Sequence, residues 1–276
     1  MKKRMFSNLI KGLILIVSLA ILVQCNQKAS NAVSGVSTDS KAVTLTQVSS
    51  FGSNPGALTM YKYAPAGISA SAPLVVALHG CTQDAATYAS DTGWTTLADE
   101  YKFYVIFPQQ SSNNNSSKCF NWFETGDIAR GVGEALSIKQ MIDKMKTDHS
   151  IDSSKVFVTG LSAGAYFTVV MAAAYPDVFA GAAPMAGGPY KCATSMTDAF
   201  SCMSPGVDKN GSAWATLIKS AYSGYTGSYP TMSIWAGDSD YTVKPMNSVE
   251  LVQGWTSVNG IDETANLVVT DERTFF

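Results

Sequence analysis

The chain has 276 residues and a formal net charge of −2 at neutral pH, with a sequence pI of about 5.7. This charge balance excludes the basic footprint that nucleic-acid binding requires. With 46% hydrophobic and 14% charged residues, the chain has ample apolar material for a core, and its length suits one α/β domain rather than two.

The N-terminus has the layout of a secretory signal. Lys2-Lys3-Arg4 precedes an apolar run over residues 13–23, which is too short for a comfortable membrane span. We expect residues 1–24 to be a signal peptide, and Gln24-Cys25 resembles a lipoprotein processing box except that Gln24 stands where a small residue is usual. Lipidation of Cys25, ordinary cleavage nearby and an uncleaved anchor remain alternatives. Residues 25–42, rich in small and polar side chains, are expected to be a flexible tether.

Residues 43–276 alternate between short apolar runs and segments of helical periodicity. This alternation predicts an α/β fold with a mostly parallel central sheet and helices on both faces, in one domain. Strands are expected near 43–47, 58–63, 73–78, 103–108, 155–159, 181–186 and 230–236, helices near 87–100, 131–147, 165–174, 213–221 and 246–258, and irregular chain over 187–211.

A Gly-X-Ser-X-Gly motif, Gly160-Leu161-Ser162-Ala163-Gly164, lies between a predicted strand and a predicted helix. On such a turn the hydroxyl projects from the top of the sheet, and the helix N-terminus offers amide donors to a developing oxyanion. Ser162 is therefore the candidate nucleophile. The alternative is a glycine-rich structural turn.

The predicted strand over 73–78 runs into His79-Gly80-Cys81, which resembles an oxyanion loop. An oxyanion hole is built from the amide after the nucleophile and an amide from such a loop. The candidates are Ala163 and Cys81.

The predicted strand over 230–236 is followed by Gly237-Asp238-Ser239-Asp240. In a Ser…Asp…His chain order, a carboxylate is needed here to orient the imidazole. Asp240 is the candidate, and Asp238 is expected to cap or brace the loop. The alternative is that both are ordinary turn aspartates.

These motifs, with residues 119–123, Arg130-Gly131 and 151–164, resemble the secreted esterases that include polyhydroxybutyrate depolymerases, feruloyl esterases and acetylxylan esterases. The resemblance covers about residues 43–245. It implies an α/β-hydrolase fold and ester hydrolysis through an acyl-serine, with Ser162 as nucleophile, Asp240 as acid, and Cys81 and Ala163 as oxyanion donors. No cofactor is expected, and no His or Cys spacing indicates a metal site.

The sequence departs from this family at the triad histidine. Members carry it on a loop after one more strand, whereas this sequence ends at Phe276 before any such residue. We therefore expect the domain to be incomplete at its C-terminus and the chain as printed to be nearly inactive. His149 is expected on the surface at the far end of the nucleophile strand. His79 is expected to brace the oxyanion loop, with service as a substitute base as the alternative.

Four cysteines remain beyond Cys25, an even number that suits an oxidising compartment. We expect Cys81 to pair with Cys119 and Cys192 with Cys202. The two other connectivities and free buried thiols stay open.

The function expected of the whole protein is that of an exported serine esterase acting on a polyester such as polyhydroxyalkanoate, or on feruloyl or acetyl esters of plant walls. Its substrate is an ester, its location the extracellular space or the outer surface as a lipoprotein, and its contact with membranes limited to a lipid anchor. Trp122, Tyr190 and Trp235 are candidates for an apolar substrate rim, with core packing as the alternative. A peptidase of the same fold and a catalytically dead surface or binding protein are the competing hypotheses.

Overall fold

The computed structural model describes residues 43–265, so the expected signal peptide and Cys25 lie outside the described residues. The expected tether lies outside them as well. Among the residues described, no helix has both the length and the apolar character needed to cross a membrane.

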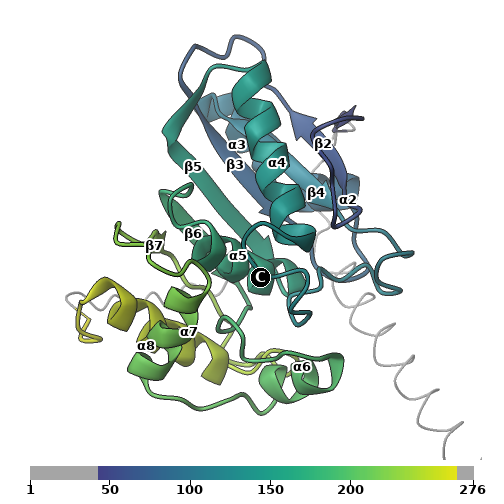
Figure 1. Cartoon of the computed structure of the whole chain (residues 1–276). Coiled ribbons are helices and arrows are strands. Elements are labelled where there is room, and N and C mark those ends of the chain that lie inside the picture. Colours follow the sequence, from purple (N-terminus) through teal and green to yellow (C-terminus); the bar gives the residue numbers. More distant parts are fainter. Residues whose placement is uncertain (1–42, 266–276) are drawn as a thin grey trace, which may run out of the picture. The chain divides into compact units, whose positions relative to one another are not determined.

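Seven strands form one sheet in the order β1-β2-β4-β3-β5-β6-β7 (Figure 1). β1 pairs with β2, and β2 pairs with β4, in antiparallel fashion, whereas every neighbouring pair from β4 to β7 is parallel. The predicted mostly parallel sheet is therefore present. The strands are β1 Thr46–Val48, β2 Thr59–Tyr63, β3 Ala72–Leu78, β4 Tyr104–Gln109, β5 Ile151–Leu161, β6 Gly181–Met185 and β7 Thr231–Met232.

The helices follow the sequence expectation except at two places. The single helix expected over 87–100 is two helices, because Gly93 adopts a left-handed conformation with φ of 69° that ends one and starts the next. The stretch expected to be irregular contains a helix that Ser195 caps by accepting from the Asp198 amide. The helices are α2 Ala85–Thr92, α3 Trp94–Tyr101, α4 Gly133–Asp148, α5 Ala163–Ala174, α6 Met196–Met203, α7 Gly211–Ser220 and α8 Met246–Asn259.

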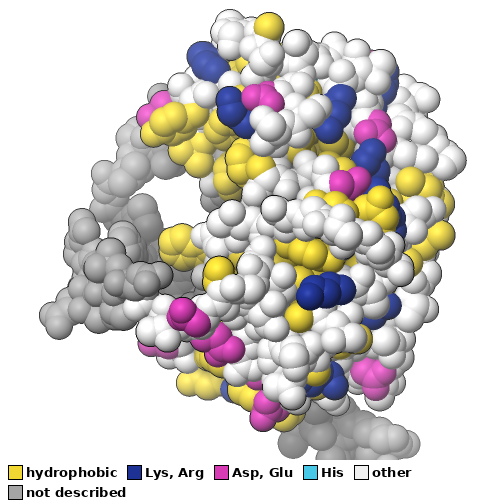
Figure 2. Space-filling view, turned by 60° about the vertical axis from the view of Figure 1, so that its left-hand side comes forward, with side chains coloured by type: hydrophobic (Ala, Val, Ile, Leu, Met, Phe, Trp, Pro, Cys, Tyr) yellow, Lys and Arg dark blue, Asp and Glu magenta, His cyan; other side chains and the backbone are white. Residues whose placement is uncertain are grey.

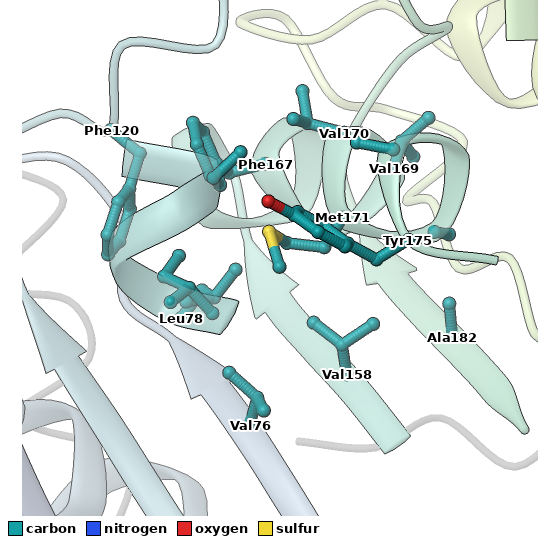
Figure 3. Close-up of a cluster of buried hydrophobic side chains, with 14 of the residues drawn as sticks. Val76, Leu78, Phe120, Val158, Phe167, Val169, Val170, Met171, Tyr175 and Ala182 are labelled. Atoms are coloured by element: carbon teal, nitrogen blue, oxygen red, sulfur yellow. The ribbon is translucent and has the colours of Figure 1, made fainter. Parts of the chain in front are cut away.

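Both faces of the sheet carry hydrophobic packing because alternate residues of a strand point to opposite faces. In β3, Val76 and Leu78 join the cluster beneath α4 and α5, whereas Val75 and Ala77 join a smaller cluster beneath α2 and α3. Figure 3 shows the larger cluster, with side chains of α5 lying over the strands. Helices therefore cover both faces, as the strand-helix alternation predicts.

Every residue of α5 is buried. Its Ala-rich composition lets the backbone lie close to β3, β5 and β6, which all pack against it. The start of this helix, where Ser162 stands, is thereby held rigidly at the edge of the sheet.

The strand that precedes Asp238 and Asp240 is shorter than expected. Regular pairing of β7 stops at Met232, yet the Ser233 and Trp235 amides still donate to the β6 carbonyls of Ala182 and Pro184 at 2.9 and 3.1 Å. The backbone therefore follows β6 as far as Trp235, and it delivers the next loop to the predicted edge.

Candidate active site

Three loops that carry the predicted site residues leave the sheet at the same edge. Leu78 pairs with Gly160, Leu161 pairs with Met185, and Met185 bridges to Trp235. Since these strands are parallel, the chain emerges beyond each of them on one side of the sheet. The fold thus brings together the predicted oxyanion loop that carries Cys81, the turn that carries Ser162 (the nucleophile turn) and the loop that carries Asp238 and Asp240 (the acid loop).

Ser162 occupies the sharp turn between β5 and α5, with φ of 55° and ψ of −119°. A non-glycine residue in such a conformation costs of the order of 1–3 kcal/mol and is typical of functional sites. The Ser162 amide donates to the Met185 carbonyl at 3.0 Å, and its carbonyl accepts from Ala165 and Tyr166 at the start of α5. Its hydroxyl is half-buried and makes no hydrogen bond to another described residue.

The two glycines of the motif are required by close packing. A Cβ atom on Gly160 would overlap the Gly164 carbonyl, and a Cβ atom on Gly164 would overlap the carbonyls of Leu78 and His79. The end of β3 is thereby brought against the start of α5. In the next loop, a Cβ atom on Gly80 would lie 3.7 Å from the Ser162 Cβ, so the predicted oxyanion loop touches the predicted nucleophile.

Two backbone amides are available to a negative oxygen beside Ser162. Within residues 43–265 neither the Cys81 nor the Ala163 amide donates a hydrogen bond to a protein acceptor, although their neighbours Gly80, Thr82 and Ser162 all do. Ala163 also begins α5, whose N-terminus favours negative charge. These are the two donors that the sequence predicts.

A disulfide holds the oxyanion loop from outside. Cys81 is bonded to Cys119 with the two Cα atoms 4.2 Å apart, and the Thr82 amide donates to the Ser117 carbonyl at 2.7 Å. The second disulfide joins Cys192 to Cys202. Both predicted pairings are present in the structure.

His79 is fully buried and both of its ring nitrogens are occupied. Nδ1 donates to the Gly80 carbonyl at 2.7 Å, and Nε2 accepts from the Gln110 amide at 3.1 Å. Burial lowers the pKa of His79, which favours this neutral form. The side chain thus braces the oxyanion loop, and the geometry does not favour the alternative role as a base.

His149 is remote from the nucleophile. It follows α4 and precedes β5, whose 11 residues span roughly 33 Å before Ser162 is reached. Its ring stacks on Tyr104 at 4.6 Å, and Nε2 accepts from Lys62 Nζ at 3.0 Å.

The acid loop assigns its two aspartates differently from the sequence expectation. Asp240 Oδ1 accepts from the Thr242 and Val243 amides at 2.8 and 2.9 Å, whereas Asp238 is exposed. Bracing of the loop, expected of Asp238, therefore falls to Asp240, because an aspartate bonds most readily to amides two or three residues further on. Oδ2 of Asp240 is free of partners among the described residues and could accept from an imidazole N–H.

Asp240 also lies near the start of α5. The pKa of Tyr166 is raised mainly by burial and further by the negative charge of Asp240. Tyr166 stands one helical turn after Ser162, at the start of α5.

Of the three aromatic rim candidates, Trp122 and Tyr190 belong to the core. They are 5% and 2% exposed, because Trp122 stacks on Tyr166 at 3.8 Å and Tyr190 reaches the Ile128 carbonyl. Trp235 differs, with 61% of its surface exposed. It borders an open hollow of about 360 Å³, which is lined by Leu161, the residue before Ser162, and by Met185, Ala186, Trp235, Ala236 and Gly237.

A buried polar cluster behind the oxyanion loop escaped the sequence analysis. Gln110 and Glu134 are each fully buried and bonded to one another. One signal could have revealed Glu134, since it lies four residues before Ile138 on the apolar stripe of α4. Within residues 43–265 no group of three or more His, Cys, Asp or Glu side chains is placed to hold a metal ion.

A strained serine between a parallel strand and a buried helix, faced by two free amides and a carboxylate loop, is the arrangement of an α/β-hydrolase. The chain belongs to the esterase PHB depolymerase family, whose model matches residues 58–274.

Three relatives illustrate this membership. The chain is 65% identical over 228 residues to poly(3-hydroxyalkanoate) depolymerase C of Paucimonas lemoignei, covering 83% of this chain and 55% of that protein. It is 34% identical over 232 residues to feruloyl esterase B of Talaromyces funiculosus, covering 82% and 65%. The structure superposes on acetyl xylan esterase from Aspergillus awamori with a TM-score of 0.76 at 36% identity, covering 81% of this chain and 82% of that one. The chain thus spans less than two thirds of the first two relatives.

Proposed function

We propose that the protein hydrolyses carboxylic esters through an acyl-enzyme on Ser162. The observation that carries this proposal is the juxtaposition at one edge of the sheet of the strained Ser162 turn and the two unpaired amides of Cys81 and Ala163. Such donors are aimed at the oxygen that becomes negative when a hydroxyl attacks an ester carbonyl.

In the proposed reaction, Ser162 Oγ attacks the ester carbonyl carbon while its proton passes to an imidazole. The carbonyl oxygen becomes an oxyanion that accepts from the Cys81 and Ala163 amides. When this tetrahedral intermediate collapses, the bond to the alcohol breaks and the alcohol takes the proton from the imidazole. Water then hydrolyses the acyl-serine by the same steps. Asp240 Oδ2 would orient the imidazole. Neither His79 nor His149 is placed to act, so the proposed reaction needs an imidazole other than these two side chains.

The substrate we infer is a polyhydroxyalkanoate. Support comes from the 65% identity to a poly(3-hydroxyalkanoate) depolymerase, against 34–37% for the feruloyl and acetylxylan esterases. The apolar hollow that Leu161 and Trp235 line, open to solvent, suits a chain of short aliphatic acyl units. Feruloyl and acetyl esters remain the second substrate class.

Export to an oxidising compartment belongs to the same proposal. Two disulfides favour it, because such bonds persist outside the cytosol. The proposed export has two alternatives: the protein is secreted after cleavage near Gln24, or it is anchored through a lipid on Cys25.

The test is turnover of p-nitrophenyl butyrate and of poly(3-hydroxybutyrate) particles by the complete gene product, purified without reductant. We expect activity that Ser162→Ala abolishes and that Asp238→Asn leaves within about twofold. Asp240→Asn should lower kcat by about 10⁴, as loss of the orienting carboxylate does in serine proteases. Activity that survives in Ser162→Ala would contradict the proposal, and cleavage of peptide anilides alone would favour a peptidase.

A non-catalytic binding protein on the hydrolase scaffold is the second candidate. It is favoured by one observation, namely that both histidines of the sequence are engaged away from Ser162. Failure of the complete gene product to hydrolyse any of these esters, together with sedimentation on polyester particles, would select it.

A further inference from the structure

Glu134 is a charged side chain with no access to solvent and no part in the reaction proposed above. It lies in the first turn of α4, and its exposed fraction is 0%. Desolvation by burial, and then the nearby charge of Asp127, raise its pKa to about 8. A carboxyl group in such a place costs stability unless its surroundings are built for it.

The surroundings consist of hydrogen-bond donors. Glu134 Oε1 accepts from Gln110 Nε2 at 2.5 Å and from Asn114 Nδ2 at 3.1 Å, while Oε2 accepts from the Asn121 amide at 2.9 Å. The Glu134 amide in turn donates to Asp127 Oδ1 at 3.1 Å. All contacts of the carboxyl group are thus with N–H donors, which lower its pKa against the effect of burial and leave no acceptor for a carboxylic O–H, so the hydrogen-bond geometry favours the carboxylate.

From this carboxylate two routes lead to the Cys81 amide. In the first, Glu134 fixes the Gln110 side chain, and the Gln110 backbone amide holds His79 Nε2 at 3.1 Å. The opposite nitrogen of His79 holds the Gly80 carbonyl at 2.7 Å, which is the peptide group that carries the Cys81 N–H. The direction of that N–H is therefore set by His79.

The second route passes through the disulfide. Gln110 Nε2 also donates to the Cys119 carbonyl at 3.2 Å, and Cys119 is bonded to Cys81. Glu134 and Gln110 thus hold both ends of the oxyanion loop, one through a histidine and one through a sulfur bridge. A group that served only to stabilise α4 would not need this convergence.

We propose that Glu134 is a positioning residue, which acts through Gln110 and His79 to aim the Cys81 amide at the oxyanion formed on Ser162. The proposal rests on the ester hydrolysis proposed above. A single oxyanion donor contributes a factor of about 10²–10³ to kcat, so a misaimed donor loses part of that factor.

The test replaces the carboxylate by an amide of the same shape, Glu134→Gln, in the complete gene product. An amide nitrogen would then face an N–H donor, and one contact of the cluster would be lost. With p-nitrophenyl butyrate we expect kcat to fall at least tenfold while KM stays within about twofold. The matched control is Ser137→Ala, which removes another buried contact of α4, the one to the Gly56 amide at 2.8 Å, and bonds to neither Glu134 nor Gln110, because it reaches the cluster only indirectly through Gly56 and Asn114. Its kcat should remain within about twofold.

A second readout does not depend on turnover. Butyrate, a carboxylate that mimics the product, is titrated while the amide signals of Cys81 and Ala163 are followed by ¹H–¹⁵N NMR. In the wild type both signals should shift with the same saturation curve. In Glu134→Gln the response of Cys81 should weaken at least tenfold while that of Ala163 persists.

The outcomes separate the two proposals. An inactive wild type whose Cys81 signal still responds to butyrate would refute hydrolysis and leave the positioning role to be decided by the variant's titration. An unchanged Cys81 response in Glu134→Gln, or none in the wild type, would overturn the positioning role. If Glu134→Gln does not fold, Gln110→Met removes the same side-chain link while keeping the amide to His79, and the same results apply.

Discussion

At the residue scale, the turn that carries Ser162 depends on glycines, which have no Cβ atom. Gly164 permits the carbonyls at the end of β3 to pass directly beneath the start of α5. That approach brings Gly80 close to Ser162, so the packing of one glycine helps to set the distance between Ser162 and the proposed oxyanion donor Cys81.

We expect Gly164→Ala to cost about 2–4 kcal/mol of unfolding free energy, because the new methyl group meets rigid backbone that cannot move aside. Urea denaturation measures this loss. Gly126→Ala is the matched control, since no atom lies within 4 Å of its added Cβ and its backbone is not left-handed. A loss at Gly164 no larger than at Gly126 would contradict the close approach.

His79 gives a second prediction at this scale, on pH dependence. Its pKa is lowered by burial, so the unfolded chain binds a proton near pH 6.5 that the folded protein does not. His79 should therefore reduce stability progressively as pH falls through 6.5. Imidazole ¹⁵N shifts should report a neutral ring protonated at Nδ1 at pH 6. A ring that titrates at its ordinary pKa would contradict the assigned hydrogen bonds.

At the element scale, the two disulfides hold different parts of the chain, and the Cys81–Cys119 bond includes a proposed oxyanion donor. The first closes a loop of 38 residues and the second a loop of 10, worth about 4 and about 3 kcal/mol from loop entropy. Only the first ends in the oxyanion loop.

We therefore expect the double variant Cys81→Ala/Cys119→Ala to lose kcat at least tenfold with its fold retained at low temperature. Cys192→Ala/Cys202→Ala should lower the melting temperature while kcat at 20 °C stays within about twofold. Paired thermal unfolding and ester hydrolysis distinguish the two variants. Equal losses of kcat would refute the distinction.

The sequence predicts elements well where pattern and packing agree. The apolar run of β3 and the Ala-rich α5 are recognisable because burial on both sides demands continuous hydrophobic residues. The break at Gly93 and the cap at Ser195 depend on single backbone conformations, which periodicity does not report.

The site divides in the same way. The sequence singles out Ser162 and the Ala163 amide because they share one local motif, whereas the Cys81 amide comes from a separate loop after β3. Asp240 braces its own loop through the local Thr242 and Val243 amides, a choice between two nearby aspartates that the sequence left open, whereas the burial of Trp122 and Tyr190 follows from contacts with distant segments. Neither spacing nor composition carries that information.

At the scale of the whole molecule, the surface is poor in charge. On the face shown in Figure 2, charged side chains of both signs are scattered, with hydrophobic ones lying between them. A large apolar hollow of about 610 Å³ lies on the sheet, bordered by α3 and by β5, β6 and β7, and Phe157 is 38% exposed in it.

An open apolar hollow should bind hydrophobic dyes and lower solubility near the pI of about 5.7. We expect Phe157→Glu to reduce anilinonaphthalene sulfonate fluorescence of the folded protein by more than half, because a carboxylate in the hollow repels the sulfonate and hydrates the apolar lining. Phe200→Glu is the control, since Phe200 is 64% exposed on α6 and lies outside the hollow. It adds the same charge, so an equal fall in both variants would locate the dye elsewhere. Turnover should be unaffected by either variant, because neither Phe157 nor Phe200 belongs to the candidate site and no candidate site residue lines the hollow.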